Sequence, residues 1–190
     1  MIDLEKELQL LAKNFGLSEK EVLTWFRSAI RQMWGNSPMK RTYMQKHVKL
    51  VTNTNPRSMK KYPRVKKYEC NIDGKLYPQN KVELDHLESE NSLKSYSDAD
   101  GFMKAILFTS PNKLQILSKD NHKIKTYAER YNMTFEQATK AKEFIQLKKD
   151  KKVVDKLIEL GVESKDIPKT KKGQEEMLYK ILLGATENET

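Results

Sequence analysis

Helical sequence patterns occupy both ends of this 190-residue chain and leave only its centre for β-structure. Apolar residues recur at helical spacing through residues 1–36, where Ser18 and Glu21 form a capping box ahead of the second stripe. Thr134 and Gln137 form another capping box in the C-terminal third. Apolar stripes at residues 138–149, 153–160 and 173–183 then predict three more helices.

Between these ends, the sequence has the short alternating patterns of β-strands. Asp73-Gly74 is typical of the tight turn between two such strands. Apolar and polar residues alternate from Val82 to Leu84, directly before Asp85 and His86. The expected strands cover residues 68–72, 75–77, 82–85 and 114–117, with short helices at 101–108 and after Ser118. The sequence therefore predicts an α+β fold that is mostly helical.

The composition narrows the class of protein. The single cysteine, Cys70, excludes an internal disulfide and a zinc site built from four thiolates. The longest apolar runs, such as residues 105–108, are far too short to cross a bilayer. The first residues lack the basic region and apolar run of a signal peptide. We therefore expect a cytoplasmic protein that has no membrane partner.

The chain has a net charge of +10, and its cations gather where acidic residues are missing. No Asp or Glu occurs between Glu21 and Glu69. A solvated surface normally mixes both signs, so this span is either a mobile basic linker or an arm that neutralises phosphates without reading sequence. Its basic residues are Arg27, Arg31, Lys40, Arg41, Lys46, Lys49, Arg57, Lys60, Lys61, Arg64, Lys66 and Lys67.

Three polar residues stand in an order that is more specific than any of them alone. His86 follows Asp85 at the end of an expected strand, and Asn112 precedes the next strand. His122 lies near the start of the helix that follows. The apolar positions around these residues fit the same pattern. This order resembles that of the HNH nuclease family, particularly its phage-encoded members, over roughly residues 60–130.

The resemblance implies a ββα-metal (His-Me) finger, in which two antiparallel strands joined by a long loop pack against a helix. It implies that Asp85 and His122 hold one divalent metal ion, with Mg²⁺ expected and Mn²⁺ as an alternative. His86 is the implied general base, and Asn112 orients it by hydrogen bonding within the long loop. Lys125 is expected to contact a phosphate, with a merely solvated helix lysine as the alternative. The implied activity is metal-dependent hydrolysis of DNA phosphodiester bonds.

These residue types suit that chemistry. A histidine has an ordinary pKa close to neutral pH, so His86 can take a proton from water. A cation held by one carboxylate and one imidazole keeps coordination positions open for phosphate oxygens. It can then act there as a Lewis acid and as a template. Asp85 and His122 supply that pair of ligands.

The sequence departs from the family pattern at the structural zinc that many members carry. The four ligand positions hold Cys70, Asp73, Ser118 and Asn121. Serine and asparagine are poor zinc ligands, so we predict no structural zinc and expect packing and hydrogen bonds in its place. Glu88 and Glu90 follow His86 and are expected to belong to an ordinary polar loop, with a further metal ligand as the alternative.

The expected organisation is an N-terminal helical segment (1–36), a basic linker or arm (37–67), the nuclease domain (68–132) and a C-terminal helical region (133–190). DNA is the expected partner, and a phage-encoded protein would act in a bacterial host. A non-catalytic DNA-binding or accessory module is the alternative, as is an RNA-directed or interaction protein with a partner on the C-terminal helices. The oligomeric state stays open. The residues expected to bind DNA are Lys60, Lys61, Arg64, Lys66, Lys67 and Lys125.

Overall fold

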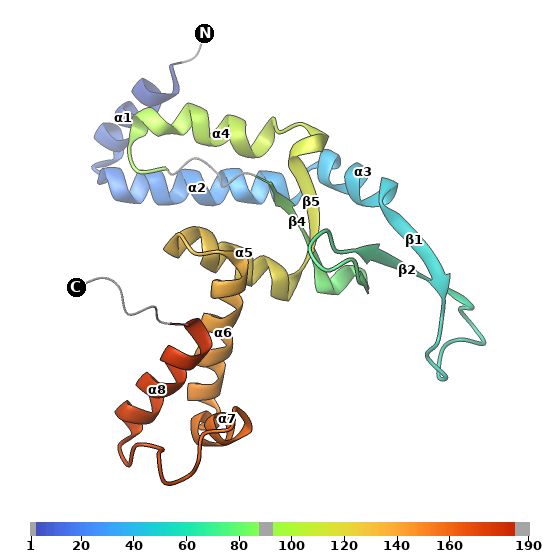
Figure 1. The fold of residues 1–190 in the computed structure, drawn as a ribbon. Coiled ribbons are helices and arrows are strands. Elements are labelled where there is room, and N and C mark those ends of the chain that lie inside the picture. Colours follow the sequence, from blue (N-terminus) through green and yellow to red (C-terminus); the bar gives the residue numbers. More distant parts are fainter. Residues whose placement is uncertain (1–2, 88–92, 185–190) are drawn as a thin grey trace. The chain divides into compact units, whose positions relative to one another are not determined.

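A computed structural model describes residues 3–87 and 93–184 (Figure 1). Helices and small antiparallel sheets occur together, so the fold is of the expected α+β class. The chain divides into two units, residues 1–119 and 120–190, which are described separately. This division falls inside the range 68–132 that was expected to form one domain. No helix in the described part of the chain is long and apolar enough to span a membrane.

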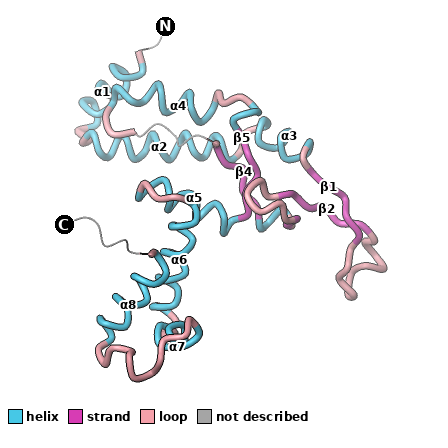
Figure 2. Tube along the Cα trace, viewed as in Figure 1, coloured by secondary structure: helices cyan, strands magenta, loops and turns pink. Residues whose placement is uncertain are grey.

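The first unit combines helices with two small sheets (Figure 2). Its helices are α1 (Leu4–Phe15), α2 (Glu19–Gly35), α3 (Pro38–Lys46) and α4 (Ala99–Leu107). Its strands are β1 (Val48–Thr52), β2 (Arg64–Glu69), β3 (Leu76–Tyr77), β4 (Val82–His86) and β5 (Leu114–Ser118). Short 3₁₀ turns are η1 (Gln79–Lys81), η2 (Tyr96–Asp98) and η3 (Pro111–Lys113).

The helices α1, α2 and α4 pack side by side and bury their apolar stripes (Figure 1). The capping box of Ser18 and Glu21 begins α2, as the sequence predicts. Gly16 ends α1 with a φ of 64°, a left-handed conformation that glycine adopts without strain. Phe102 and Ile106 of α4 are fully buried in this core. Each contributes about 1.5–3 kcal/mol of hydrophobic stabilisation relative to an exposed side chain.

The segment 37–67, expected as a basic linker or arm, forms the helix α3 and most of the β1–β2 hairpin. Ser37 caps α3 by accepting a hydrogen bond from the Lys40 N–H. The hairpin loop is organised by Asn53, whose side-chain amide donates to the Ser58 hydroxyl (3.1 Å) and to the Tyr62 carbonyl (2.8 Å). An ordered arm therefore carries the basic residues of this span.

The hairpin continues into β3 through the turn at Asp73-Gly74. Tyr68 pairs with Tyr77 across β2 and β3, and Gly74 has the positive φ of 65° that the turn requires. The Asn71 N–H donates to the Ile116 carbonyl (2.8 Å), and the Ile116 N–H donates to the Asn71 side chain (2.9 Å). These two bonds fasten the turn segment to β5.

The second unit is helical. Its four helices are α5 (Lys119–Tyr131, which begins on the last residue of the first unit), α6 (Phe135–Lys149), α7 (Val153–Glu159) and α8 (Lys171–Leu183). Thr134 and Gln137 form the predicted capping box of α6. Val153, Leu157 and Leu178 make its buried core, where Leu157 and Leu178 are fully enclosed. Lys148 of α6 forms an ion pair with Glu175 of α8 (2.7 Å).

Candidate functional site

The strands β4 and β5 position the residues on which the sequence analysis concentrated. They pair in antiparallel register, with Asp85 opposite Gln115 and His86 opposite Leu114. A connection of residues 87–113 joins them and contains α4. Leu87 extends the pairing, since its N–H donates to the Lys113 carbonyl (2.8 Å). The end of β4 at Asp85 and His86 is therefore fixed by its pairing with the start of β5.

Asp85 is held by its cross-strand neighbour. The side-chain amide of Gln115 donates to Asp85 Oδ2 at 2.9 Å. Gln115 is 7% exposed and Asp85 is half-buried. A buried amide that bonds one carboxylate oxygen fixes the orientation of the other, which is the usual arrangement behind a metal-binding carboxylate. The sequence analysis gave Gln115 no role, because only the strand register reveals it.

His86 lies on the other face of β4. Burial alternates along the strand, with Val82, Leu84 and His86 buried and the residues between them half-buried. The His86 ring packs against Trp34 of α2, with ring centroids 5.1 Å apart and planes tilted by 43°. The side chain is 8% exposed, and its Nε2 atom is buried. His86 therefore faces the helical core rather than the Asp85 face of the sheet.

The neighbourhood of His86 is fixed from α3 as well. The Tyr43 hydroxyl donates to the carbonyl of Leu114, the register partner of His86, at 3.0 Å. Burial raises the pKa of Tyr43. The Tyr43 ring stacks on His47, with centroids 4.0 Å apart. Tyr43 therefore ties α3 to the first residue of β5, directly opposite His86.

Asn112 lies in η3, two residues before the register partner of His86. It is exposed, and its Oδ1 accepts a hydrogen bond from the Ser110 hydroxyl. This bond stays within the turn that leads into β5. The expected orienting contact from Asn112 to the loop after His86 stays a prediction, since residues 88–92 lie outside the described part of the chain.

His122 and Lys125 belong to the second unit. His122 is half-buried on the first turn of α5, and its carbonyl accepts from the Thr126 hydroxyl (2.9 Å). The ammonium of Lys125 pairs with Glu129 at 2.5 Å. The pairing of Asp85 with His122 joins two separately described units, so it stays a prediction. Glu88 and Glu90, the alternative ligands, lie outside the described residues.

Among residues 3–87 and 93–184, no group of three or more His, Cys, Asp and Glu side chains is arranged to hold a metal ion. The set implied by the sequence is smaller than that, with Asp85 and His122 as its only protein ligands. A hard divalent cation such as Mg²⁺ often has only one or two protein ligands. Water and phosphate oxygens then take its remaining coordination positions.

The turn at residues 70–77 holds Asp73 with hydrogen bonds. The Tyr77 hydroxyl donates to Asp73 Oδ2 (2.7 Å), and the Lys75 N–H donates to Asp73 Oδ1 (3.0 Å). The hydrogen bond to Asp73 is the main cause of the raised pKa of Tyr77, while a hydrogen bond with Ser118 acts in the opposite direction. Cys70 is fully buried beside this group. Three of the four positions at which the family places zinc ligands thus surround one tyrosine.

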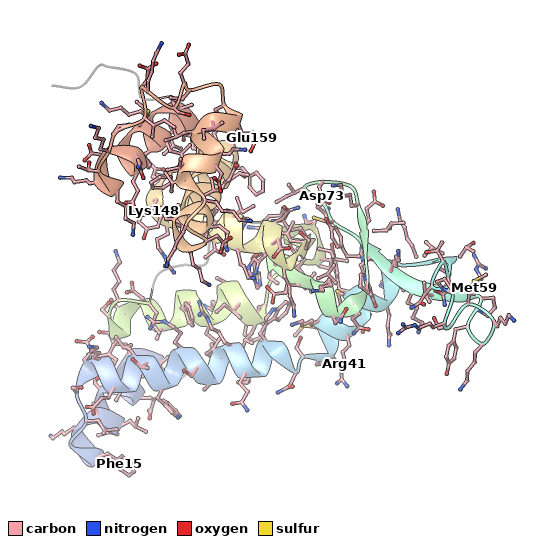
Figure 3. All side chains as sticks on the ribbon, turned by 90° about the horizontal axis from the view of Figure 1, so that it is seen from below. Phe15, Arg41, Met59, Asp73, Lys148 and Glu159 are labelled. Carbon is pink, nitrogen blue, oxygen red and sulfur yellow. The ribbon has the colours of Figure 1, made fainter. Side chains whose placement is uncertain are left out.

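Most of the basic residues expected to contact DNA lie within the β1–β2 hairpin. Lys60 and Lys61 lie in its exposed loop, near Met59 at the tip (Figure 3). Lys61 stands over the Tyr62 ring, 5.4 Å from the centroid. Arg64 donates to the Leu50 carbonyl (3.3 Å). Lys66 and Lys67 point to opposite faces of β2, because side chains alternate along a strand.

Comparisons with protein-family models, with curated proteins and with solved structures found no match.

Proposed function

We propose that this chain is a metal-dependent DNA endonuclease of the HNH type, which hydrolyses phosphodiester bonds by nicking or cutting. The main support is the hydrogen bond that orients Asp85 from Gln115 within the β4–β5 pair. Two antiparallel strands, a long connection between them and a helix that begins directly after β5 follow the order of a ββα-metal finger. The basic β1–β2 hairpin is a suitable arm for the DNA backbone.

The proposed roles follow from the donor atoms. The Asp85 carboxylate and the His122 imidazole hold one divalent cation, Mg²⁺ or Mn²⁺, and Gln115 keeps the carboxylate in place. When bound, such an ion supplies Lewis acidity to the phosphate oxygens. His86 takes the proton from the attacking water, and Asn112 steadies the turn that leads into β5. Lys125 and the hairpin cations contact neighbouring phosphates.

The base role makes one demand on His86. Its ring packs on Trp34 and its Nε2 is buried, so it has to turn away from the helical core to reach a water molecule next to the phosphate. His86 is the last residue of β4, and the Leu87–Lys113 hydrogen bond follows it directly, so few strand hydrogen bonds lie beyond the turning residue. DNA binding at the end of the strand is the proposed cause of that movement.

The burial of His86 also favours a second candidate, a DNA-binding or accessory module without catalysis. A histidine that packs against a tryptophan in the core is a normal structural residue. In that case the basic hairpin binds DNA and the β4–β5 pair only supports it. The two candidates differ in whether DNA is cleaved and not in whether it is bound.

A plasmid-nicking assay separates the candidates. The purified chain is incubated with supercoiled DNA and Mg²⁺ or Mn²⁺, with EDTA as the metal control. Asp85→Asn removes the proposed ligand without changing its size, and Asp100→Asn removes an exposed carboxylate of α4 as the matched control. The endonuclease proposal expects nicked or linear DNA from the wild type and from Asp100→Asn, but not from Asp85→Asn.

Two outcomes count against the endonuclease. Tight DNA binding without metal-dependent cleavage, across supercoiled, linear and single-stranded substrates, supports the accessory module. Equal cleavage by wild type and Asp85→Asn shows that any nuclease activity arises elsewhere or from a contaminant.

A further inference from the structure

A basic hollow lies in the first unit, apart from the hairpin tip. It has a volume of about 580 Å³ and is bordered by α3, β2, β4 and the residue after β5. Pockets for drug-sized ligands have volumes in the range of ~300–1,000 Å³, so the hollow admits a unit as large as a nucleotide. Four cations line it, Lys40 and Arg41 from α3, Lys66 from β2, and Lys119.

The cations of this hollow lack acidic partners. Within the described part of the chain, none of the four forms an ion pair, whereas many other lysines do. Glu83 is the one carboxylate of the lining, so the surplus is three positive charges. Like charges gathered without counter-charges repel one another and oppose folding. Binding of an anion relieves that repulsion, which makes the hollow a favourable place for one.

The walls of the hollow strengthen its field. Tyr68, Val82 and Leu84 line it and are at most 7% exposed, so they form an apolar wall behind the charges. A hollow lined by charges of one sign against low-dielectric walls focuses the potential and raises the local concentration of counter-ions. A phosphate at this place is therefore held more strongly than on the open hairpin loop.

The position of Glu83 connects the hollow with Asp85. The two residues are half-buried and stand two apart on the same face of β4, which separates them by about 6–7 Å. The face of β4 that carries Glu83 at the hollow therefore also carries Asp85. Met59, at the hairpin tip, lies well away from Arg41 of α3 (Figure 3). The hollow and the tip are thus separate contact points for a long polyanion.

We propose that this hollow binds the phosphodiester backbone of duplex DNA next to Asp85, through Lys40, Arg41, Lys66 and Lys119. The inference rests on the proposed function, because it names a substrate contact of the same site. The hollow is the inner anchor of the strand to be cleaved, and the hairpin tip is an outer contact.

Three triple variants test the anchor, and each removes the same number of charges. The hollow variant is Lys40→Ala/Arg41→Ala/Lys119→Ala. The tip variant is Arg57→Ala/Lys60→Ala/Lys61→Ala. The control is Lys13→Ala/Lys20→Ala/Lys94→Ala, which removes exposed cations of α1, α2 and the segment before η2. Binding of a fluorescent DNA duplex is measured in EDTA between 50 mM and 200 mM salt, so that no cleavage takes place. Circular dichroism and thermal melting check that each variant is folded.

The hollow variant is expected to bind DNA about 10- to 100-fold more weakly at ~0.1 M salt. The slope of log affinity against log salt should fall by about two to three, because each phosphate contact releases close to one counter-ion. The control should stay within about threefold of wild type, as expected for charges that contact no phosphate. A folded hollow variant that binds as the control does overturns the inference, even if the wild type cleaves DNA.

The binding and cleavage results are independent. Loss of DNA binding in the hollow variant, together with no nuclease activity in the wild type, supports the anchor and rejects the endonuclease. Binding of inorganic phosphate or a mononucleotide in the hollow, without DNA binding, overturns the anchor. Preference for an RNA duplex over the DNA duplex also overturns it as stated.

Discussion

Gln115 donates a hydrogen bond to the Asp85 carboxylate at 2.9 Å, from the directly opposite position on the neighbouring strand. Both residues belong to regular strands, so their relative position is set by backbone pairing rather than by a loop. Gln115 is almost fully buried, which restricts its side chain to few rotamers. The Gln115 amide therefore helps to set the orientation of Asp85.

Replacing Gln115 tests this dependence. Gln115→Leu keeps the size but removes the donor, so the Asp85 carboxylate loses a hydrogen-bonding partner that helps to orient it. Loss of such an outer contact typically lowers metal affinity or activity about 10- to 100-fold. We expect the Mn²⁺ concentration for half-maximal nicking to rise by that factor. The measurement is the nicking rate over a series of Mn²⁺ concentrations.

Gln32→Leu is the matched control, because Gln32 is an exposed glutamine of α2 that does not line the basic hollow. It should leave both the metal dependence and the melting temperature unchanged. If Gln115→Leu melts like the wild type and needs no more metal than the wild type, Asp85 does not rely on Gln115.

His86→Phe separates a catalytic histidine from a structural one. Phenylalanine keeps an aromatic ring against Trp34 but cannot accept a proton. Removal of a general base typically lowers the rate by about 10²- to 10⁴-fold. We expect nicking to fall by such a factor while DNA affinity and the melting temperature stay close to those of the wild type. Full nicking activity in this variant would exclude His86 as the base.

Much of the helical structure is predictable from the sequence, because it depends on local signals. The capping boxes at Ser18–Glu21 and Thr134–Gln137 and the glycine at the end of α1 act within a few residues of one another. The β1–β2 hairpin was expected only as a linker or arm. Burial does not alternate regularly along β1, and β2 buries only Tyr68, so these strands carry no clear apolar alternation. The loop between them depends on Asn53, a contact that the sequence does not reveal.

The site is less predictable, because it depends on the register between β4 and β5 and on which face of β4 each side chain occupies. The order of Asp85, His86, Asn112 and His122 is readable in the sequence, but the pairing of Asp85 with Gln115 requires the strand register. The face of β4 on which His86 lies could have been predicted from the sequence. Val82 and Leu84 alternate with polar residues, and this alternation continues to His86 and places it with the buried side chains.

Tyr77→Phe tests whether hydrogen bonds hold the turn at residues 70–77. The variant loses the bond from the Tyr77 hydroxyl to Asp73, so we expect a lower melting temperature. We predict no structural zinc at this turn, so EDTA should leave the melting temperature of the wild type unchanged. A fall in the wild-type melting temperature on chelation, reversed by added Zn²⁺, would reject this interpretation.

The same bond predicts a pH dependence. Asp73 raises the pKa of Tyr77 in the folded chain, so the unfolded chain loses this proton first as the pH rises. The stabilisation by Tyr77 is complete below the ordinary tyrosine pKa and is lost as the pH rises through the raised one. Wild type should therefore lose more stability than Tyr77→Phe above about pH 10. Denaturant unfolding at a series of pH values measures the difference, and parallel curves would contradict it.

Asn53→Ala tests whether the order of the hairpin matters for its proposed role. The variant loses the bonds to Ser58 and Tyr62 and the one that Asn53 accepts from the Asn55 N–H (3.0 Å). We expect a loss of about 1–3 kcal/mol in local stability, seen as faster hydrogen exchange of the amides in residues 54–62. The basic residues remain, so DNA affinity should fall only a few-fold, because the loop must be ordered again on binding at an entropic cost.

Asn80→Ala removes an exposed asparagine of η1 as the control. Faster exchange with unchanged DNA affinity would mean that the hairpin binds DNA by charge alone or that it does not contact DNA.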